Sequence, residues 1–312
     1  MVWELSEVKV GVVGVGAWGK NIVRVLKELE GEGLVNVVGV ADTDVGRALE
    51  VANTFKVGTH VRTVKELAEL GVEAVAISVP INELFQVAKE ALSLGLHAFI
   101  EKPVSTKPEE VAELIKVAES SSLVAQPGFI VRYDPVIKAL KNALRGKIKY
   151  LVFKRLSARP LHKRRFSVVL DLMIHDVDLA LNLINPHEIK LMSVAGFKVE
   201  NNIPQEVHAS LLLDGAVTYL ITDGVLPVKV RSVEVVTEST YCEASFTDST
   251  LNVRGADRSY VQKVEGEEPL KAELRDFIRS VSGGKPSDAP TLHDALRALE
   301  VVKLIEQGLS RV

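Results

Sequence analysis

The chain has 312 residues, of which 47% are hydrophobic and 25% charged, and its formal net charge is −3. This length is sufficient for two domains, and the small net charge argues against nucleic acid or a membrane surface as the main partner. No apolar run approaches the ~18 residues that span a bilayer, and Met1–Glu4 lack the basic start of a signal peptide, so we expect a cytoplasmic protein.

Cysteine and histidine usage restricts the chemistry further. The single cysteine, Cys242, excludes an internal disulfide and a cysteine-rich metal site. The seven histidines are scattered, and no pair has the spacing of zinc ligands. We therefore predict no metal.

Strand and helix patterns alternate over the first ~125 residues, which predicts a mainly parallel, doubly wound sheet of the Rossmann type. Apolar runs predict strands at 8–13, 35–41, 74–79, 97–100 and 123–125. Helical patterns lie at 21–29, 45–55, 64–70, 83–93 and 108–120. A boundary at Gln126-Pro127-Gly128 then divides the chain into domains 1–126 and 127–312.

A glycine-rich turn, Gly14-Val15-Gly16-Ala17-Trp18-Gly19, follows the first strand and opens the first helix. There the first glycine makes the turn, the second lets a pyrophosphate approach, and the third lets helix pack on strand. The second strand ends at Asp42, whose carboxylate can bind ribose hydroxyls and would repel a 2′-phosphate. The pattern predicts binding of NAD(H) rather than NADP(H), and the alternative is a doubly wound domain that binds nothing. The predicted contacts are Gly14, Gly16, Ala17, Trp18, Gly19 and Asp42.

Two further strand ends face the same predicted crevice. One apolar run ends at Val79-Pro80, and another ends in Glu101-Lys102-Pro103. Ligands of doubly wound sheets lie off the carboxyl ends of the strands, so we assign these residues to the cofactor site. The Lys102 ammonium can also hold a substrate oxygen and stabilise alkoxide charge. A surface lysine at a strand end is the alternative.

After the boundary, the pattern changes to an α+β domain. Helices are predicted at 135–144, behind an Asp134 N-cap, and at 168–184, and closing helices at 270–281 and 292–309. Between them, apolar residues recur at period two over 189–264, which predicts an open, mainly antiparallel sheet with helices on one face. A sheet with one uncovered face favours a homo-oligomer, a dimer or tetramer, although solvent can also cover that face.

The helix predicted at 168–184 carries Asp171, His175 and Asp178 at spacings that place them on one face. Their apolar neighbours predict partial burial, and buried polar groups need partners. Histidine is a natural base for a hydroxyl near neutral pH. The alternative is a helix capped by Asp171 with a hydrogen-bonded core histidine.

Together, these motifs resemble the glucose–fructose oxidoreductase / inositol dehydrogenase (Gfo/Idh/MocA) family over nearly the whole chain. The segment Gly128-Phe129-Ile130-Val131-Arg132-Tyr133-Asp134-Pro135 is also similar to the family's entry into its second domain. The resemblance implies reversible hydride transfer between a nicotinamide cofactor and a carbinol carbon of a sugar or cyclitol. It assigns the catalytic Lys-Asp-His set to Lys102, Asp171 and His175.

The chain departs from the family pattern at two places. Family members often have a glycine-rich turn before the Asp/His helix and a glycine two residues before the histidine, where this chain has Ser167–Leu170 and Met173. Many also have a histidine four residues after the strand-end proline, where Leu84 stands here. Both changes alter the predicted pocket wall and leave the catalytic groups in place.

The substrate is expected to be a small sugar. Trp18-Gly19-Lys20-Asn21 and the glycine-poor Asp/His helix resemble the branch that oxidises nucleotide sugars such as UDP-N-acetylglucosamine at the 3-position. A cationic segment, 154–165, suits a diphosphate, although a solvated loop or an oligomer contact explains it equally well. The predicted substrate contacts are Arg132, Tyr133, Arg159, Arg164, Arg165 and Asp178. A free sugar, inositol or other polyol is the alternative substrate, and a non-catalytic NAD-binding sensor is the alternative class.

Overall fold

The computed structural model describes residues 7–200, 202–284 and 289–310, so Met1–Glu4 lie outside the described residues. The chain divides into two compact units, Met1–Ile130 with Glu268–Leu296 and Val131–Glu267 with Arg297–Val312. The first break therefore falls close to the predicted boundary at Gln126–Gly128. The segment Glu268–Leu296, which the sequence analysis assigned to the second domain, belongs to the first unit.

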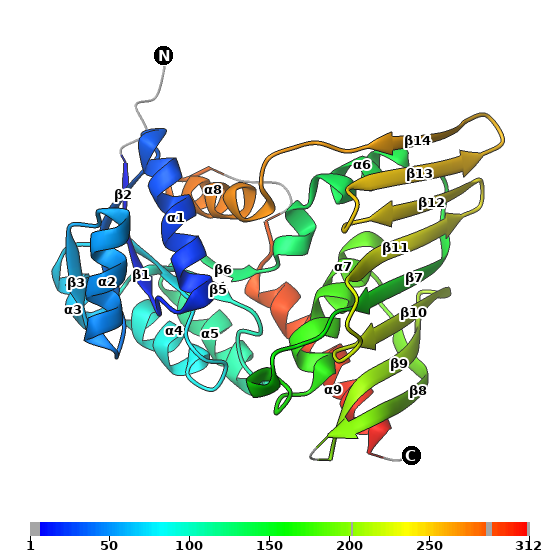
Figure 1. Cartoon of the computed structure of the whole chain (residues 1–312), viewed down its shortest axis with the longest axis horizontal. Helices are drawn as coiled ribbons and strands as arrows, with labels where there is room; N and C mark the ends of the chain where they lie inside the picture. Colours follow the sequence, from blue (N-terminus) through cyan, green and yellow to red (C-terminus); the bar gives the residue numbers. More distant parts are fainter. Residues whose placement is uncertain (1–6, 201, 285–288, 311–312) are drawn as a thin grey trace. The chain divides into compact units, whose positions relative to one another are not determined.

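The first unit contains a six-stranded parallel sheet in the order β3-β2-β1-β4-β5-β6 (Figure 1). The strand order reverses between β1 and β4, which is the arrangement of a doubly wound sheet and confirms that prediction. The strands are β1 (Val8–Val13), β2 (Val35–Ala41), β3 (Thr59–Val61), β4 (Ala74–Ile77), β5 (His97–Glu101) and β6 (Ala125–Gly128).

Local signals start most helices of this unit. Asp44 caps α2, Thr63 and Glu66 form a capping box at α3, and Pro108 opens α5. The helices are α1 (Ala17–Gly31), α2 (Val45–Phe55), α3 (Val64–Glu69), α4 (Leu84–Ser93), α5 (Pro108–Ser120) and α8 (Pro269–Val281).

Helix α8 joins the first unit through its apolar face. Leu270, Leu274 and Phe277 are buried in the same core cluster as Leu26 of α1 and Phe99 of β5. The Phe277 and Phe99 ring centroids lie 5.9 Å apart. Burial of this stripe explains why the helix belongs to the first unit although it follows the second sheet in sequence.

The second unit contains an eight-stranded sheet in the order β14-β13-β12-β11-β7-β10-β9-β8 (Figure 1). Neighbouring strands are antiparallel except β7 and β10, which are parallel, so the predicted mainly antiparallel sheet is confirmed. The strands are β7 (Ile148–Leu156), β8 (Ile189–Glu200), β9 (Ile203–Leu213), β10 (Ala216–Asp223), β11 (Val230–Thr237), β12 (Thr240–Ser245), β13 (Thr250–Gly255) and β14 (Ser259–Lys263).

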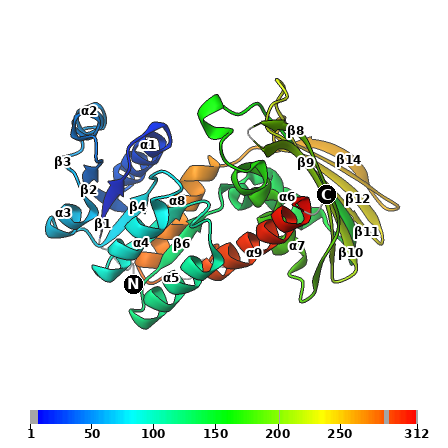
Figure 2. The same ribbon diagram turned by 90° about the horizontal axis from the view of Figure 1, so that it is seen from below.

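Helices α6 (Pro135–Ala143) and α7 (Ile174–Ile184) lie against one face of this sheet (Figures 1 and 2). Phe153 of β7 and Leu220 of β10 point to that face and are fully buried, whereas Tyr150 and Tyr219 on the other face are exposed. The alternation of apolar residues along these strands therefore indicates which face of the sheet the helices cover. The last helix, α9 (Leu292–Leu309), begins in the first unit and ends in the second.

The segment predicted as one helix at 168–184 has two parts. Residues Val169–Met173 form a π-helical turn, and α7 continues from Ile174. A π turn holds more residues than an α turn, so the α-helical spacing assumed between Asp171 and His175 does not apply across it. Such turns occur frequently at functional sites.

Candidate functional site

In the first unit, the three glycines of the turn after β1 have different steric surroundings. Gly14 has a φ of +82°, and a Cβ there would lie 2.5 Å from the carbonyl oxygen of Ser78. A Cβ on Gly19 would overlap the carbonyl oxygen of Gly14, so this glycine lets α1 pack against the turn. A Cβ on Gly16 would meet nothing within 4 Å. Gly16 therefore borders open space, as a site for close approach of a pyrophosphate requires.

The N-terminus of α1 faces the same turn. Its N-cap is Gly16, no side chain caps the helix, and its first turn has no acidic residue. The first N–H groups of a helix have no intrahelical partner and carry partial positive charge, which favours an anion. Ala17 and Trp18 occupy the first two helical positions. The residues present thus fit the phosphates of a dinucleotide.

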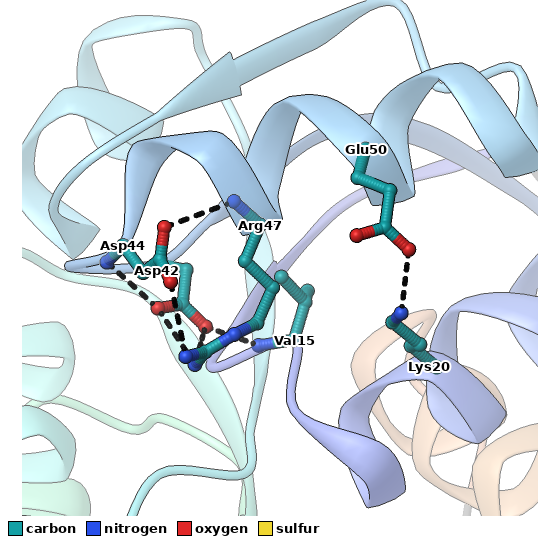
Figure 3. A network of polar contacts seen from close by, with 6 residues as sticks. All are labelled: Val15, Lys20, Asp42, Asp44, Arg47 and Glu50. Atoms are coloured by element: carbon teal, nitrogen blue, oxygen red, sulfur yellow. Dashed lines mark hydrogen bonds and ion pairs between the residues drawn. The ribbon is translucent and has the colours of Figure 1, made fainter.

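Asp42 follows β2 and is buried next to this turn (Figure 3). One carboxylate oxygen accepts the Val15 N–H at 3.0 Å, and the other accepts the Asp44 N–H at 2.9 Å. The Arg47 guanidinium lies 3.3 Å from both oxygens. Asp42 therefore has the expected place beside the glycine-rich turn, with an arginine partner that the sequence analysis did not identify.

A hollow opens between the starts of α1 and α2, beside this network (Figure 3). Lys20 of α1 and Arg47 of α2 are the cations that line it. Lys20 pairs with Glu50 at 2.9 Å, and Arg47 pairs with Asp44 at 3.1 Å. The other lining residues are Gly16, Ala17, Asp44, Gly46 and Glu50.

The carboxyl ends of β4 and β5 carry the remaining candidates of the first unit. Val79 and Pro80 follow β4, and Val79 lies beside Gly14. Glu101 is the last residue of β5 and accepts hydrogen bonds from Trp18 Nε1 at 2.5 Å and from the backbone N–H of Lys102 at 3.2 Å. The Glu101 carboxylate thus connects the first turn of α1 to the backbone of Lys102.

In the second unit, Asp171 lies in the π-helical turn and His175 in the first turn of α7, and both are partly buried. The Arg159 guanidinium donates to Asp171 at 3.3 Å, to Gln205 at 2.6 Å and to the Phe166 carbonyl at 3.2 Å. Burial lowers the pKa of Arg159, while the Asp171 carboxylate raises it. Arg159 thereby ties Asp171 to β9 and to the loop before the π turn.

Two more carboxylates of α7 are also held by arginines. Arg132 forms two hydrogen bonds to Asp178, of 2.8 and 2.6 Å, and both side chains are at most 5% exposed. Arg155 of β7 binds Asp176 in the same two-pronged geometry at 2.8 and 2.6 Å. The sequence analysis had assigned Arg132, Arg159 and Asp178 to the substrate, and the structure places all three in these buried ion pairs.

The remaining predicted substrate contacts lie nearer solvent. Arg164 pairs with Glu200 at 2.9 Å, and the Arg165 guanidinium lies 5.1 Å from the centre of the Phe166 ring. Tyr133 ends a short 3₁₀ helix, Ile130–Tyr133, and is partly buried. Arg164 and Arg165 both lie on the loop that Arg159 anchors.

Sequence reasoning missed Arg47 and Asp176, and it assigned Arg155 to the cationic segment 154–165, whereas the structure pairs Arg155 with Asp176 in a buried site. Arg47 lies three residues after the Asp44 N-cap, and side chains at this spacing are neighbours on a helix, so an ion pair between them could have been predicted. Arg155 has the same parity as Phe153 on β7, which places it on the buried face and so predicts a buried partner. Asp176 has no comparable local signal.

Within 7–200, 202–284 and 289–310, no group of three or more His, Cys, Asp or Glu side chains could hold a metal ion. Over the same ranges, no helix is both long and apolar enough to cross a membrane.

Comparison with known proteins gives consistent matches. Residues 8–129 match the Gfo/Idh/MocA family, described as an oxidoreductase family with an NAD-binding Rossmann fold. UDP-N-acetylglucosamine 3-dehydrogenase of Acidithiobacillus ferrooxidans is 29% identical over 292 residues, 90% of this chain and 91% of that one. A solved structure of the enzyme of that name and organism matches with a TM-score of 0.89 over 98% of both chains, at 27% identity. Inositol 2-dehydrogenase of Rhizobium meliloti is 26% identical over 63% of this chain and 61% of its own length.

Proposed function

We propose that the chain is an oxidoreductase of the Gfo/Idh/MocA family, and that it oxidises a secondary hydroxyl of a nucleotide sugar with NAD⁺. The observation that carries this proposal is the open space over Gly16 at the uncapped start of α1. The same chain also carries Lys102, Asp171 and His175.

The cofactor would be held by the first unit. When bound, a nicotinamide dinucleotide supplies reversible acceptance of a hydride. The N–H groups at the start of α1 would bind its pyrophosphate, and Asp42 would bind the adenosine ribose. The further proposed contacts are Gly14, Gly19, Ala17, Trp18, Val79, Pro80, Glu101 and Lys102.

We assign the proton transfer to His175. In the oxidation direction its imidazole removes the hydroxyl proton, and in the reduction direction its imidazolium returns a proton to the carbonyl oxygen. The Lys102 ammonium holds the same oxygen and stabilises alkoxide charge. Asp171, which Arg159 holds, orients the substrate or the imidazole.

The nucleotide-sugar assignment is supported by two observations. One relative, which is 29% identical and matches over 90% of this chain and 91% of its own length, is named a UDP-N-acetylglucosamine 3-dehydrogenase. Arg164 and Arg165 lie on one anchored loop, and arginines suit the oxygens of a diphosphate. Because Arg132 and Arg159 are already bound to carboxylates, we assign them to orienting Asp178 and Asp171.

The test is reduction of NAD⁺ with UDP-N-acetylglucosamine, followed by the absorbance of the reduced cofactor and by the mass of the oxidised sugar. His175→Ala should lower turnover about 10²- to 10⁴-fold, the usual contribution of a positioned acid–base group. Its affinity for NADH should remain that of the wild type. His187→Ala, an exposed histidine of the same unit, is the matched control. Full activity of His175→Ala would exclude this residue as the base.

A free inositol or other polyol is the second candidate, favoured by the similarity to inositol 2-dehydrogenase. The same assay with myo-inositol and free N-acetylglucosamine separates the two, since only a nucleotide-sugar enzyme needs the diphosphate. Tight NADH binding without turnover of any of these would instead indicate a non-catalytic sensor.

We also propose that the exposed face of the eight-stranded sheet mediates self-association. Tyr150 and Tyr219 on this face are 39% and 46% exposed, and their direct cross-strand partners are Val217 and Val152, respectively. A row of apolar side chains on an open face favours burial against a second copy. Sedimentation should give a dimer or tetramer that Tyr219→Glu dissociates, and a wild-type monomer would contradict this.

A further inference from the structure

The carboxylate of Asp42 already has three partners in the protein. Its two oxygens accept N–H groups from Val15 and Asp44, and the Arg47 guanidinium approaches both. The Asp42 side chain is 6% exposed, whereas that of Arg47 is 43% exposed. A ribose that approaches Asp42 from the hollow therefore meets the guanidinium of Arg47 (Figure 3).

This geometry changes the electrostatic argument made from Asp42 alone. An unpaired carboxylate would repel a 2′-phosphate, but here the charge of Arg47 lies 3.3 Å from both carboxylate oxygens and offsets that repulsion. Arg47 and Lys20 also line the hollow, so two cations are within reach of a ligand there.

The remaining acids of the hollow are exposed. Asp44 and Glu50, the partners of Arg47 and Lys20, are 54% and 65% exposed. Exposed ion pairs contribute little to stability, so Arg47 and Lys20 can exchange these partners at small cost. A phosphate binds arginine through two parallel hydrogen bonds, as a carboxylate does, and carries a larger negative charge, so it can compete with these carboxylates for the two cations.

We propose that Arg47 makes the adenosine end of the site accept a 2′-phosphate, so that the protein binds NADP(H) as well as NAD(H). With NAD(H), Arg47 pairs with Asp42; with NADP(H), its guanidinium stays beside Asp42 and also donates to the phosphate, and Lys20 contributes a second cation. The inference rests on the proposed cofactor site and is independent of the sugar substrate.

The test is a fluorescence titration of the wild-type protein with NADH and with NADPH, which needs no substrate. We expect the two dissociation constants to lie within about tenfold of each other. In Arg47→Gln, NADPH affinity should fall about 10- to 100-fold, the contribution of a charge-assisted hydrogen bond, while NADH affinity changes less than about threefold. Lys20→Gln should show a smaller loss of the same sign.

Arg24→Gln is the matched control, because Arg24 is an ion-paired cation of α1 that does not line the hollow. It should leave both affinities unchanged. A wild-type preference for NADH above tenfold, or equal losses of both cofactors in Arg47→Gln, would overturn the inference. Absence of binding of both cofactors to the wild type would contradict the proposed function itself, and the inference with it.

Discussion

The two units satisfy their polar groups in different ways. In the first unit, the groups proposed to bind cofactor are backbone N–H groups, glycine positions and one carboxylate held largely by backbone. In the second unit, Asp171, Asp176 and Asp178 are each held by an arginine that is at most 5% exposed. The first unit thus depends on steric fit at a turn, and the second on buried ion pairs.

This difference indicates which substitutions should destabilise each unit. A buried ion pair contributes little net stability, yet removing one partner leaves an uncompensated charge in the interior. A crowded glycine tolerates no side chain, although it forms no interaction that a substitution could remove. Four predictions, from the largest expected effect to the smallest, test this contrast.

The largest effect is expected at the buried pair of Arg155 and Asp176. Arg155→Met should destabilise the second unit by about 3–5 kcal/mol, because Asp176 loses its two-pronged partner in a buried site. Calorimetric unfolding measures the change. The double variant Arg155→Met/Asp176→Leu should recover most of the loss, since it leaves no buried carboxylate. A single variant as stable as the wild type would refute the dependence on ion pairs.

The second effect compares two glycines of one turn. Gly19→Ala should destabilise the first unit by about 1–3 kcal/mol, because its Cβ would overlap the Gly14 carbonyl. Gly16→Ala meets nothing within 4 Å, so it should change stability little and weaken NADH binding instead. Thermal unfolding and NADH titration of both variants separate packing from ligand contact. Equal stability losses would show that the space over Gly16 is not free.

A smaller effect is expected at His97, whose Nδ1 accepts the Val124 N–H at 2.9 Å. Burial lowers the pKa of His97, so the folded state favours the neutral imidazole. The contribution of His97 to the free energy of unfolding is therefore present at pH values above the ordinary histidine pKa. It is lost as pH falls from there through the lower pKa of the folded state.

Two substitutions check this titration. His97→Ala should cost about 0.5–1.5 kcal/mol at pH 8, the net value of one hydrogen bond. His97→Asn places an acceptor oxygen near the Nδ1 position, and the asparagine side chain does not titrate. The unfolding midpoint of this variant should therefore fall less between pH 8 and pH 5 than that of the wild type. An unchanged slope in His97→Asn would assign that pH dependence to other groups.

The smallest effect is expected at the surface between α1 and α8. Hydrogen bonds from Arg275 and Lys271 lower the pKa of Glu32 to about 2. The contribution of this exposed cluster is present above the ordinary glutamate pKa and is lost as pH falls toward 2. Glu32→Gln should lower the unfolding midpoint slightly at pH 7 and low salt, and not at pH 2. Glu69→Gln, an exposed glutamate of α3, is the control, and equal shifts at both pH values would contradict this account.

Sequence reasoning was effective where the determinants are local. The strands 8–13 and 35–41 and the helices 45–55 and 108–120 have the expected bounds, because alternation, caps and prolines act within a few residues. Gly14, Gly16 and Gly19 also have the steric environments that their spacing predicts. The assignment of catalytic roles to Lys102, Asp171 and His175 remains a prediction.

The amino-acid pattern alone determined a doubly wound first domain, an open and mainly antiparallel second sheet, and a glycine-rich turn after the first strand. Only the tertiary structure decided the partners of the polar groups. Arg159, Arg155 and Arg132 lie 12, 21 and 46 residues from the carboxylates that they hold. It also placed α8 in the first unit and Arg47 on Asp42. Pairing across such separations depends on how sheets and helices pack, which no periodicity within one element records.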